Sequence, residues 1–136
     1  MPRTISVEIE QIAPSTGSAT ARNHTVYVDR PVEKGGSDRG PLGGEYLLIS
    51  LGGCFLSTLL AAARTREADL SNVRVAVSGT IGGVPERFES IALRVSGKYP
   101  DEALMHKLVA LAERGCLVTN TLKNAVTIRV DVEKST

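Results

Sequence analysis

Residues 43–68 read GGEYLLISLGGCFLSTLLAAARTREA and hold a long uncharged run with Cys54 at its centre. A run of about 18 uncharged residues is the lower limit for crossing a bilayer. Glycines and hydroxyl residues dilute this run, and Glu45 and Arg64 bound it closely, so we disfavour a membrane span. Apolar residues occupy nearly every face from Glu45 to about Ala68, which predicts a helix surrounded by protein.

The composition is that of a soluble globular protein. The 136 residues fit one domain over residues 1–136, and 42% of them are hydrophobic. Sixteen Lys and Arg against 15 Asp and Glu leave a net charge of +1, which favours neither nucleic acid nor a membrane surface as partner. The amino terminus, MPRTISVEIEQ, lacks the apolar segment of a secretory signal, so we expect a cytoplasmic location.

Five segments alternate between apolar and polar residues, which is typical of half-buried strands. They are TISVEIE (4–10), SATARNHTVYVDRP (18–31), VRVAVSGTIGG (73–83), RFESIALRVSGKY (87–99) and AVTIRVDVE (125–133). Their apolar faces include Ile5, Val7, Ile9, Val73, Val75, Val77, Ile91, Leu93, Val95, Val126, Ile128, Val130 and Val132. The first two segments predict one hairpin and the next two a second hairpin. Residues 33–44 are rich in Gly and charge and predict a loop.

A second helix is predicted over PDEALMHKLVALAERGC, residues 100–116. Asp101 suits its first turn, and Gly115 suits the position after its end. The elements then follow the order ββαββαβ, an α+β fold with antiparallel sheets around a long central helix. Two short hairpins and one amphipathic helix cannot cover a helix that is apolar all round. We therefore expect a homodimer with the central helix near the subunit interface.

Other chemistries find little support in the sequence. His24 and His106 lie far apart without ligand-spaced partners, so no metal site is expected. The segments GGSDRG and GGVPERF lack the setting of a phosphate loop, so we expect no nucleotide cofactor. Aromatic residues are only 4% of the chain, which argues against RNA binding. Cys54 and Cys116 form neither a C-x-x-C redox pair nor a zinc knuckle.

Three segments together resemble a known family. GPLGGEYLLISLGGCF, a hairpin with RFESIALRVSG, and ALAERGCLVTNTL resemble the OsmC/Ohr family of thiol-dependent peroxidases, over most of the chain from about residue 20. The resemblance implies an intertwined α+β homodimer that reduces organic hydroperoxides to alcohols, with its active sites at the subunit interface. It also implies that Cys54 is the peroxidatic cysteine, on the central helix, and that Cys116 is the resolving cysteine.

The chemistry of thiols agrees with these roles. A thiol attacks a peroxide as the thiolate, and since the ordinary pKa of cysteine is about 8.5, a cation or hydrogen-bond donor must favour that form. The resulting sulfenic acid is protected if a second thiol condenses with it into a disulfide. In the family an arginine held by a carboxylate supplies the cation. By this resemblance Glu45, nine positions before Cys54, is the carboxylate, and Arg22 is the first candidate for the arginine, ahead of Arg30 and Arg39.

Several alternatives stay open. Glu45 also suits the first turn of a helix, where a carboxylate interacts favourably with the helix dipole. Many relatives have proline directly after the second cysteine, whereas Leu117 follows Cys116 here, which is expected to loosen the local geometry. The spacing of Glu45 fits the OsmC-like branch better than the Ohr branch.

The expected partners are a peroxide and a reductant. Leu51, Phe55 and Leu59 are near Cys54 in sequence, and we expect them to form a hydrophobic pocket for bulky organic hydroperoxides. A small dithiol or a lipoyl protein is the expected reductant. The alternative function is that of a non-catalytic dimer that binds a small apolar ligand in the interface cavity.

Overall fold

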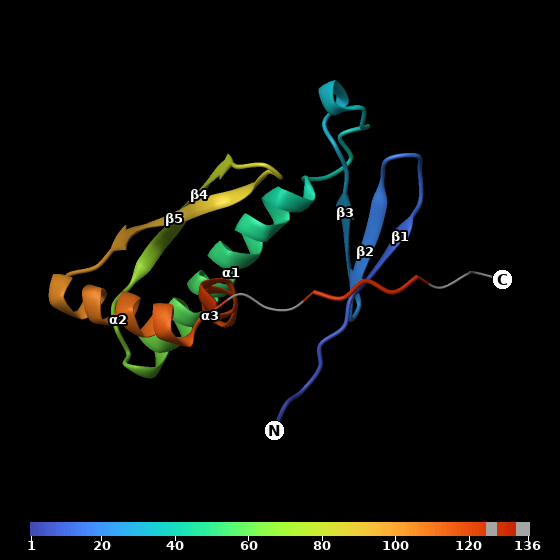
Figure 1. Ribbon diagram of the computed structural model, residues 1–136. Coiled ribbons are helices and arrows are strands. Elements are labelled where there is room, and N and C mark those ends of the chain that lie inside the picture. The colour runs from blue at the N-terminus through green and yellow to red at the C-terminus, as the bar shows by residue number, and fades with distance from the viewer. Residues whose placement is uncertain (125–127, 133–136) are drawn as a thin grey trace. The chain divides into compact units, whose positions relative to one another are not determined.

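The computed structural model describes residues 1–124 and 128–132 (Figure 1). The chain forms two compact units, Met1–Ile49 and Ser50–Thr136, and we describe each by itself. The long helix α1 (Gly43–Thr65) begins in the first unit and continues in the second. The expectation of one domain over residues 1–136 stays a prediction.

The amino-terminal unit contains an antiparallel sheet of three strands in the order β1-β2-β3 (Figure 1). The strands are β1 (Glu8–Gln11), β2 (Gly17–Ala21) and β3 (His24–Val28). The prediction of a single strand over residues 18–31 is wrong, because this segment forms the β2–β3 hairpin. Ala21 pairs with His24, so Arg22 and Asn23 make the turn. Arg22 has a φ of 57°, which is uncommon for a residue with a side chain.

The first strand also differs from the prediction. It begins at Glu8, whereas the alternation of residues 4–10 predicts a strand over that whole segment. The apolar side chains of Ile5, Val7 and Ile9 are 72%, 61% and 59% exposed, so the half-buried face that the alternation predicts is open to solvent in the single chain.

A buried carboxylate organises the loop after β3. Asp29 is 3% exposed and accepts hydrogen bonds from the hydroxyls of Ser15 and Thr16, both at 2.8 Å. The backbone N–H groups of Arg30 and Arg39 also donate to it, at 2.7 and 3.1 Å. Burial raises the pKa of Asp29, but these four donors outweigh that effect and hold the pKa well below its usual range.

The loop predicted over residues 33–44 is therefore ordered by its hydrogen bonds to the Asp29 carboxylate. A short 3₁₀ helix, η1 (Val32–Lys34), begins it, and helix α1 begins at its end. The Tyr46 hydroxyl donates a hydrogen bond of 2.7 Å to the carbonyl oxygen of Tyr27, which ties the first turns of α1 to β3.

The carboxyl-terminal unit places two helices against one face of a long hairpin (Figure 1). Its elements are the rest of α1, β4 (Ser71–Gly82), β5 (Arg87–Lys98), α2 (Glu102–Gly115) and α3 (Leu117–Asn124). The predicted second hairpin and second helix are thus confirmed. Asp101 caps α2 by accepting a hydrogen bond from the backbone N–H of Leu104 at 3.0 Å.

The core of this unit joins all of these elements, α3 through Val118. Its buried members come from α1, α2 and the residue after α2: Leu51, Phe55, Leu59, Ala63, Met105, Leu108, Ala112 and Cys116. The predicted inward face of the hairpin is confirmed, because its side chains pack against this cluster: Val73, Val75, Val77, Ile91, Leu93 and Val95.

Two glycines set how closely α1 packs. A Cβ on Gly52 would lie 2.7 Å from Cγ2 of Val77, so the bare glycine lets α1 approach β4. A Cβ on Gly115 would lie 3.2 Å from Cγ2 of Thr58, so the end of α2 also packs closely on α1, though less tightly. Both close approaches lie within two turns of Cys54 on α1.

The end of the chain differs most from the prediction. Residues 128–132 contain no strand, and the side chains of Ile128, Val130 and Val132 are 82%, 83% and 94% exposed. The prediction of an inward-facing strand is therefore wrong for these residues, since no neighbouring strand pairs with them in the described chain. The other residues of that segment, 125–127 and 133, lie outside the described residues.

The α+β class with antiparallel sheets is confirmed, although the order of elements differs. Along the described residues the strands and α-helices run βββαββαα. The amino-terminal unit has three strands where two were predicted, α3 follows α2, and residues 128–132 form no strand. Helix α3 was not predicted at all.

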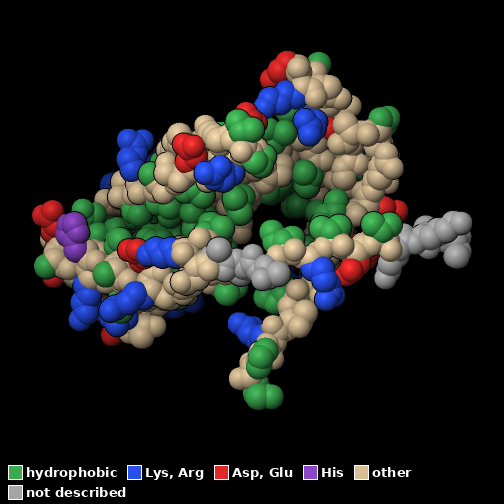
Figure 2. Space-filling view, viewed as in Figure 1, with side chains coloured by type: hydrophobic (Ala, Val, Ile, Leu, Met, Phe, Trp, Pro, Cys, Tyr) green, Lys and Arg blue, Asp and Glu red, His purple; other side chains and the backbone are tan. Residues whose placement is uncertain are grey.

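The long helix is covered along one stripe only. Its buried residues are Leu51, Gly52, Phe55, Leu59 and Ala63. Ile49 and Leu60, on other faces, are 55% and 39% exposed, and green hydrophobic side chains gather over α1 between the β4–β5 hairpin and α2 (Figure 2). By length and composition, α1 alone among the described helices could span a membrane. Its packed stripe instead makes it the core helix of the carboxyl-terminal unit.

Candidate thiol site

Cys54 lies in the middle of α1, one residue before the buried Phe55. Its side chain is half-buried and packs against the edge of the hydrophobic core. The Thr58 hydroxyl donates a hydrogen bond of 2.8 Å to the carbonyl oxygen of Cys54, one turn back along the helix. The thiol is thus held on a regular helix, between the core and the surface.

Cys116 lies between α2 and α3 and has no exposed surface. It follows the last residue of α2 and directly precedes the first residue of α3. The backbone N–H of Thr119, in the first turn of α3, points to its sulfur at 3.5 Å. The sulfur therefore occupies the place of a helix cap, where free N–H groups converge.

The surroundings of Cys116 favour its thiolate. Burial raises the pKa of this thiol, but hydrogen bonds from the Thr119 hydroxyl and backbone N–H lower it. The Cys54 thiol and the backbone N–H of Val118 lower it further. The net result is a pKa below the ordinary value for cysteine.

The two thiols lie together. Cys54 packs against the core cluster that contains Cys116 and is close enough to lower the pKa of the Cys116 thiol, and both cysteines are free. The close contact of Gly115 with Thr58 of α1 explains the pairing, because it brings the end of α2 to the turn of α1 that follows Cys54. The two cysteines are 62 positions apart in sequence, and the fold brings their sulfur atoms together.

Glu45 caps the helix that carries Cys54. Its Oε1 accepts a hydrogen bond of 2.8 Å from the backbone N–H of Leu42, the residue before α1 begins. A glutamate at the third position of a helix that bonds back in this way forms half of a capping box. The role in the first turn is confirmed. Among residues 1–124 and 128–132 no ion pair links Glu45 to an arginine.

The candidate arginines are all exposed. Arg22 lies in the β2–β3 turn, and no residue of the described chain pairs with its guanidinium. Arg30 and Arg39 flank the loop around Asp29 and donate backbone N–H groups to its carboxylate. The Arg39 guanidinium lies over the ring of Tyr27, 5.2 Å from its centre.

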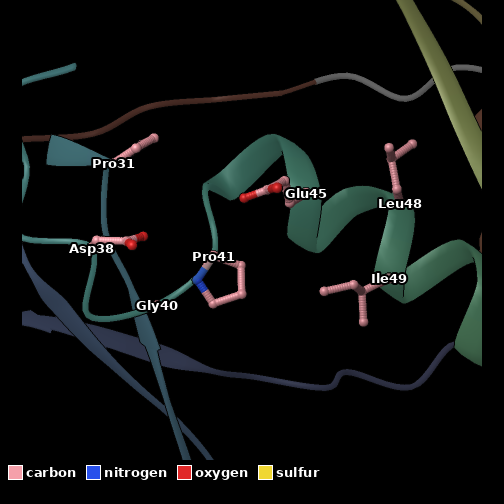
Figure 3. Close-up of a pocket in the computed structure, with 7 residues that line it drawn as sticks. All are labelled: Pro31, Asp38, Gly40, Pro41, Glu45, Leu48 and Ile49. Carbon is pink, nitrogen blue, oxygen red and sulfur yellow. The ribbon is translucent and has the colours of Figure 1, made fainter. Parts of the chain in front are cut away.

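A hollow of about 470 Å³ opens beside Glu45 in the amino-terminal unit. It is lined by Pro31, Asp38, Gly40, Pro41, Glu45, Leu48 and Ile49. Figure 3 shows the carboxylates of Asp38 and Glu45 pointing toward each other from the loop and from the helix. The walls are otherwise apolar, so the hollow suits a cationic or apolar group.

The predicted pocket of Leu51, Phe55 and Leu59 is wrong. These side chains are 4%, 5% and 0% exposed and fill the core instead of lining a cavity. The error follows from helix geometry, because the residues nearest to Cys54 in sequence lie on the stripe that faces β4, β5 and α2. Cys54 borders that stripe and is itself half-buried.

Two residues with clear structural roles, Thr119 and Asp29, were not identified from the sequence. Thr119 contacts the Cys116 sulfur only because α3 begins at Leu117, and that helix was not predicted. The alternation of residues 18–31 places Asp29 on the polar face of a strand and gives no sign of its burial. The one available signal for Thr119 was its place three residues after Cys116, the spacing between a helix cap and the N–H group that it accepts. In the described part of the chain no three His, Cys, Asp or Glu side chains are grouped to hold a metal ion.

Comparison with known proteins identifies relatives of the chain. A profile of the family OsmC, described as OsmC-like protein, matches residues 35–131. None of the curated proteins matches the sequence. An OsmC-like protein from Mycoplasma pneumoniae has a similar structure, with a TM-score of 0.78 at 19% identity over 90% of this chain and 89% of that chain.

Two further structures share the fold. One is an organic hydroperoxide resistance protein OsmC from Legionella pneumophila, with a TM-score of 0.66 at 18% identity over 89% of this chain and 90% of that chain. The other is an organic hydroperoxide resistance protein from Elizabethkingia anophelis, with a TM-score of 0.68 at 17% identity over 90% of each chain.

Proposed function

The chain belongs to the OsmC-like protein family, and we propose that it reduces organic hydroperoxides to alcohols through Cys54 and Cys116. The observation that carries this proposal is the proximity of the two free thiols, since Cys54 packs against the core cluster that contains Cys116. The half-buried Cys54 is the thiol that a peroxide reaches, and the buried Cys116 is the thiol that follows it. Family relatives named for organic hydroperoxide resistance support the substrate class.

The reaction then runs in two steps. The Cys54 thiolate attacks one oxygen of the hydroperoxide, so that an S–O bond forms, the O–O bond breaks and the departing alkoxide takes a proton to become the alcohol. Sulfur is oxidised and the peroxide is reduced. The Cys116 thiolate next attacks the sulfenic acid of Cys54, forming the S–S bond and releasing hydroxide, which a proton converts to water. A dithiol reductant returns both thiols.

Activation of Cys54 requires a positive charge nearby. Arg22, held by Glu45, is our proposed source, with Arg30 and Arg39 as the other candidates. The proposal includes a homodimer, because only one stripe of α1 is covered in the single chain. A monomer at micromolar concentration in analytical ultracentrifugation would contradict the dimer. A cytoplasmic location, where reduced thiols persist, is consistent with the two free cysteines.

The central test follows thiols and peroxide together. Reduced protein is mixed with cumene hydroperoxide, and peroxide loss, free thiols and disulfide are measured. We expect stoichiometric loss of peroxide and a Cys54–Cys116 disulfide in the wild type. Cys54→Ser should abolish the reaction, since its hydroxyl forms no anion at neutral pH.

Variants at Cys116 separate the two steps. Both Cys116→Ser and Cys116→Ala should allow one round of attack and then accumulate sulfenic or sulfinic acid on Cys54, detected as added oxygen by mass spectrometry. The alanine variant controls for a hydroxyl buried in the core. Equal first-turnover rates in the Cys54 and Cys116 variants would reject the assignment of roles.

The roles of Glu45 and the arginines are tested with variants that keep the local backbone conformation and hydrogen bonds. Glu45→Gln keeps an acceptor for the Leu42 N–H and removes only the charge. Arg22→Asn removes the cation and suits the positive φ of the turn. If Arg22 and Glu45 activate the thiol, both variants should slow the attack of all peroxides alike. Arg30→Ala or Arg39→Ala slowing it instead would move the role to that arginine.

A second function class is supported by the hollow beside Glu45. Its volume of about 470 Å³ and walls from Pro41 and Leu48 suit a small apolar ligand. A dimer that only binds such a ligand would leave thiols and peroxide unchanged at stoichiometric protein. That result would refute the proposed peroxidase activity and favour the ligand-binding function.

A further inference from the structure

The two sulfur atoms of the pair differ in access. Cys54 is half-buried, whereas Cys116 has no exposed surface and belongs to the hydrophobic core. A thiol that reduces a disulfide must approach one sulfur along the S–S axis, and the rate depends on which sulfur it can reach. The incoming thiolate can therefore reach the Cys54 side of the pair more readily.

The two sulfur atoms also differ in what stabilises them as thiolates. The Cys116 sulfur caps α3, an eight-residue helix, and accepts from the backbone N–H of Thr119 at 3.5 Å. The positive end of the helix dipole lies at the same place. The Thr119 hydroxyl also favours the thiolate, because it lowers the pKa of Cys116. A sulfur held in this way is the better leaving group when a disulfide is broken.

We propose that reduction of the Cys54–Cys116 disulfide has a fixed direction, in which the reductant's thiolate attacks Cys54, Cys116 leaves, and Thr119 is the positioning residue that receives the departing sulfur. This inference rests on the proposed function, because it concerns the same disulfide. In the step, an S–S bond forms between the reductant and Cys54, and the bond between Cys54 and Cys116 breaks. The electron pair of that bond goes to the Cys116 sulfur.

The second thiol of the dithiol completes the cycle. It attacks the reductant's own sulfur in the mixed disulfide and releases the Cys54 thiolate. The reductant leaves as a cyclic disulfide, oxidised by the two electrons that the protein gains. Cys116 then stands ready at the amino terminus of α3 for the next sulfenic acid.

The first experiment measures the Cys116 thiolate alone. In a Cys54→Ser background, thiolate absorbance near 240 nm is followed against pH, which requires no access to the buried sulfur. Thr119→Val, which removes the hydroxyl but keeps the shape, should raise the midpoint by about one pH unit. Thr119→Ser should restore it.

A matched control lies two residues along the same helix. The hydroxyl of Thr121 donates to the carbonyl oxygen of Leu117 at 2.9 Å, and within the described residues no hydrogen bond joins it to either sulfur. Thr121→Val should leave the midpoint unchanged. A midpoint that moves equally in the Thr119 and Thr121 variants, or in neither, would overturn the role of Thr119.

The second experiment identifies the sulfur that is attacked. The disulfide is formed in wild-type protein with diamide, so that the test does not depend on peroxidase activity. A monothiol, 2-mercaptoethanol, is added and quenched with acid, and peptide mapping locates the adduct. We expect at least about a tenfold excess of adduct on Cys54 over Cys116.

Thr119→Val should slow adduct formation about threefold or more, whereas Thr121→Val should not. An adduct shared equally between the cysteines, or found mainly on Cys116, would overturn the proposed direction. A protein that forms this adduct on Cys54 but never consumes peroxide would retain the inference about the thiol pair and refute the peroxidase.

Discussion

Replacing Gly52 with alanine measures how closely α1 lies against β4. The new Cβ would be 2.7 Å from Cγ2 of Val77, closer than two carbon atoms pack, and a valine side chain has little freedom to move away. Overpacking of this kind costs about 1–3 kcal/mol. Alanine in place of glycine inside a helix gains about 1 kcal/mol. The free energy of unfolding should therefore fall by about 0–2 kcal/mol.

The neighbouring Gly53 provides the control. It lies in the same helix, and a Cβ there would meet no atom within 4 Å. Gly53→Ala should therefore raise the free energy of unfolding by about 1 kcal/mol. Both variants gain the same helix propensity, so it cancels in the difference between their free energies of unfolding. The remaining difference, about 1–3 kcal/mol, measures the contact with Val77.

Urea unfolding followed by circular dichroism measures both variants, with reductant present and at matched protein concentration, because assembly would shift the apparent stability. Slopes that agree with the wild type allow the midpoints to be compared directly. Equal stability of the Gly52 and Gly53 variants would refute the close approach of α1 to β4. It would also weaken the account of why Cys54 borders the core.

Three further predictions concern the loop, the second cysteine and the second helix. The pKa of Asp29 is lower in the folded than in the unfolded chain. Its contribution to the free energy of unfolding is therefore present above the unfolded pKa of about 4 and is lost as the pH falls toward the folded pKa. The unfolding temperature measured between pH 2 and 6 should depend less on pH in Asp29→Asn than in the wild type. Leu117→Pro should leave the fold intact and raise the free energy of unfolding by about 0.4–1 kcal/mol in urea titrations, because Cys116 is extended (φ −80°, ψ 113°) and residue 117 is the first of α3. Asp101→Ala should lower it by about 1 kcal/mol by leaving the Leu104 N–H without its cap, whereas Asp101→Asn should retain most of the stability.

The elements with strong periodicity were predictable. The β4–β5 hairpin and α2 follow directly from apolar spacing, and α1 follows from a long run that no strand could accommodate. The β2–β3 turn was missed because Arg22 and Asn23 lack the glycine that usually marks a two-residue hairpin turn.

Helix α3 was missed for a different reason. Its sequence, LVTNTLKN, is rich in Thr and Asn, which have low helix propensity, so the local signal opposes the structure. The contact of Thr119 with Cys116 depends on that helix, so it could not be predicted either. The expectation that Leu117 loosens the geometry is also revised, since Cys116 and residue 117 already have the backbone conformation that a proline would impose.

The candidate site was predictable only in part. The contact of the two thiols depends on how α2 returns to α1, and local periodicity carries no information about it. The resemblance supplied the two cysteines and their expected roles. The burial of Asp29 could not be predicted, because the five residues that donate hydrogen bonds to its carboxylate come from two separate stretches of the chain.

The burial of Cys116 also constrains how this position can change in evolution. A residue with no exposed surface in the core is selected for its volume as well as for its chemistry. A descendant that no longer used the thiol would still need a small apolar side chain there. We expect drift to replace Cys116 by alanine or valine, and expect serine to be rare, because its hydroxyl would need a partner in the core. Cys54 lies at the border of the core and is half-buried, so a descendant without the proposed thiol chemistry would be free to vary more widely there.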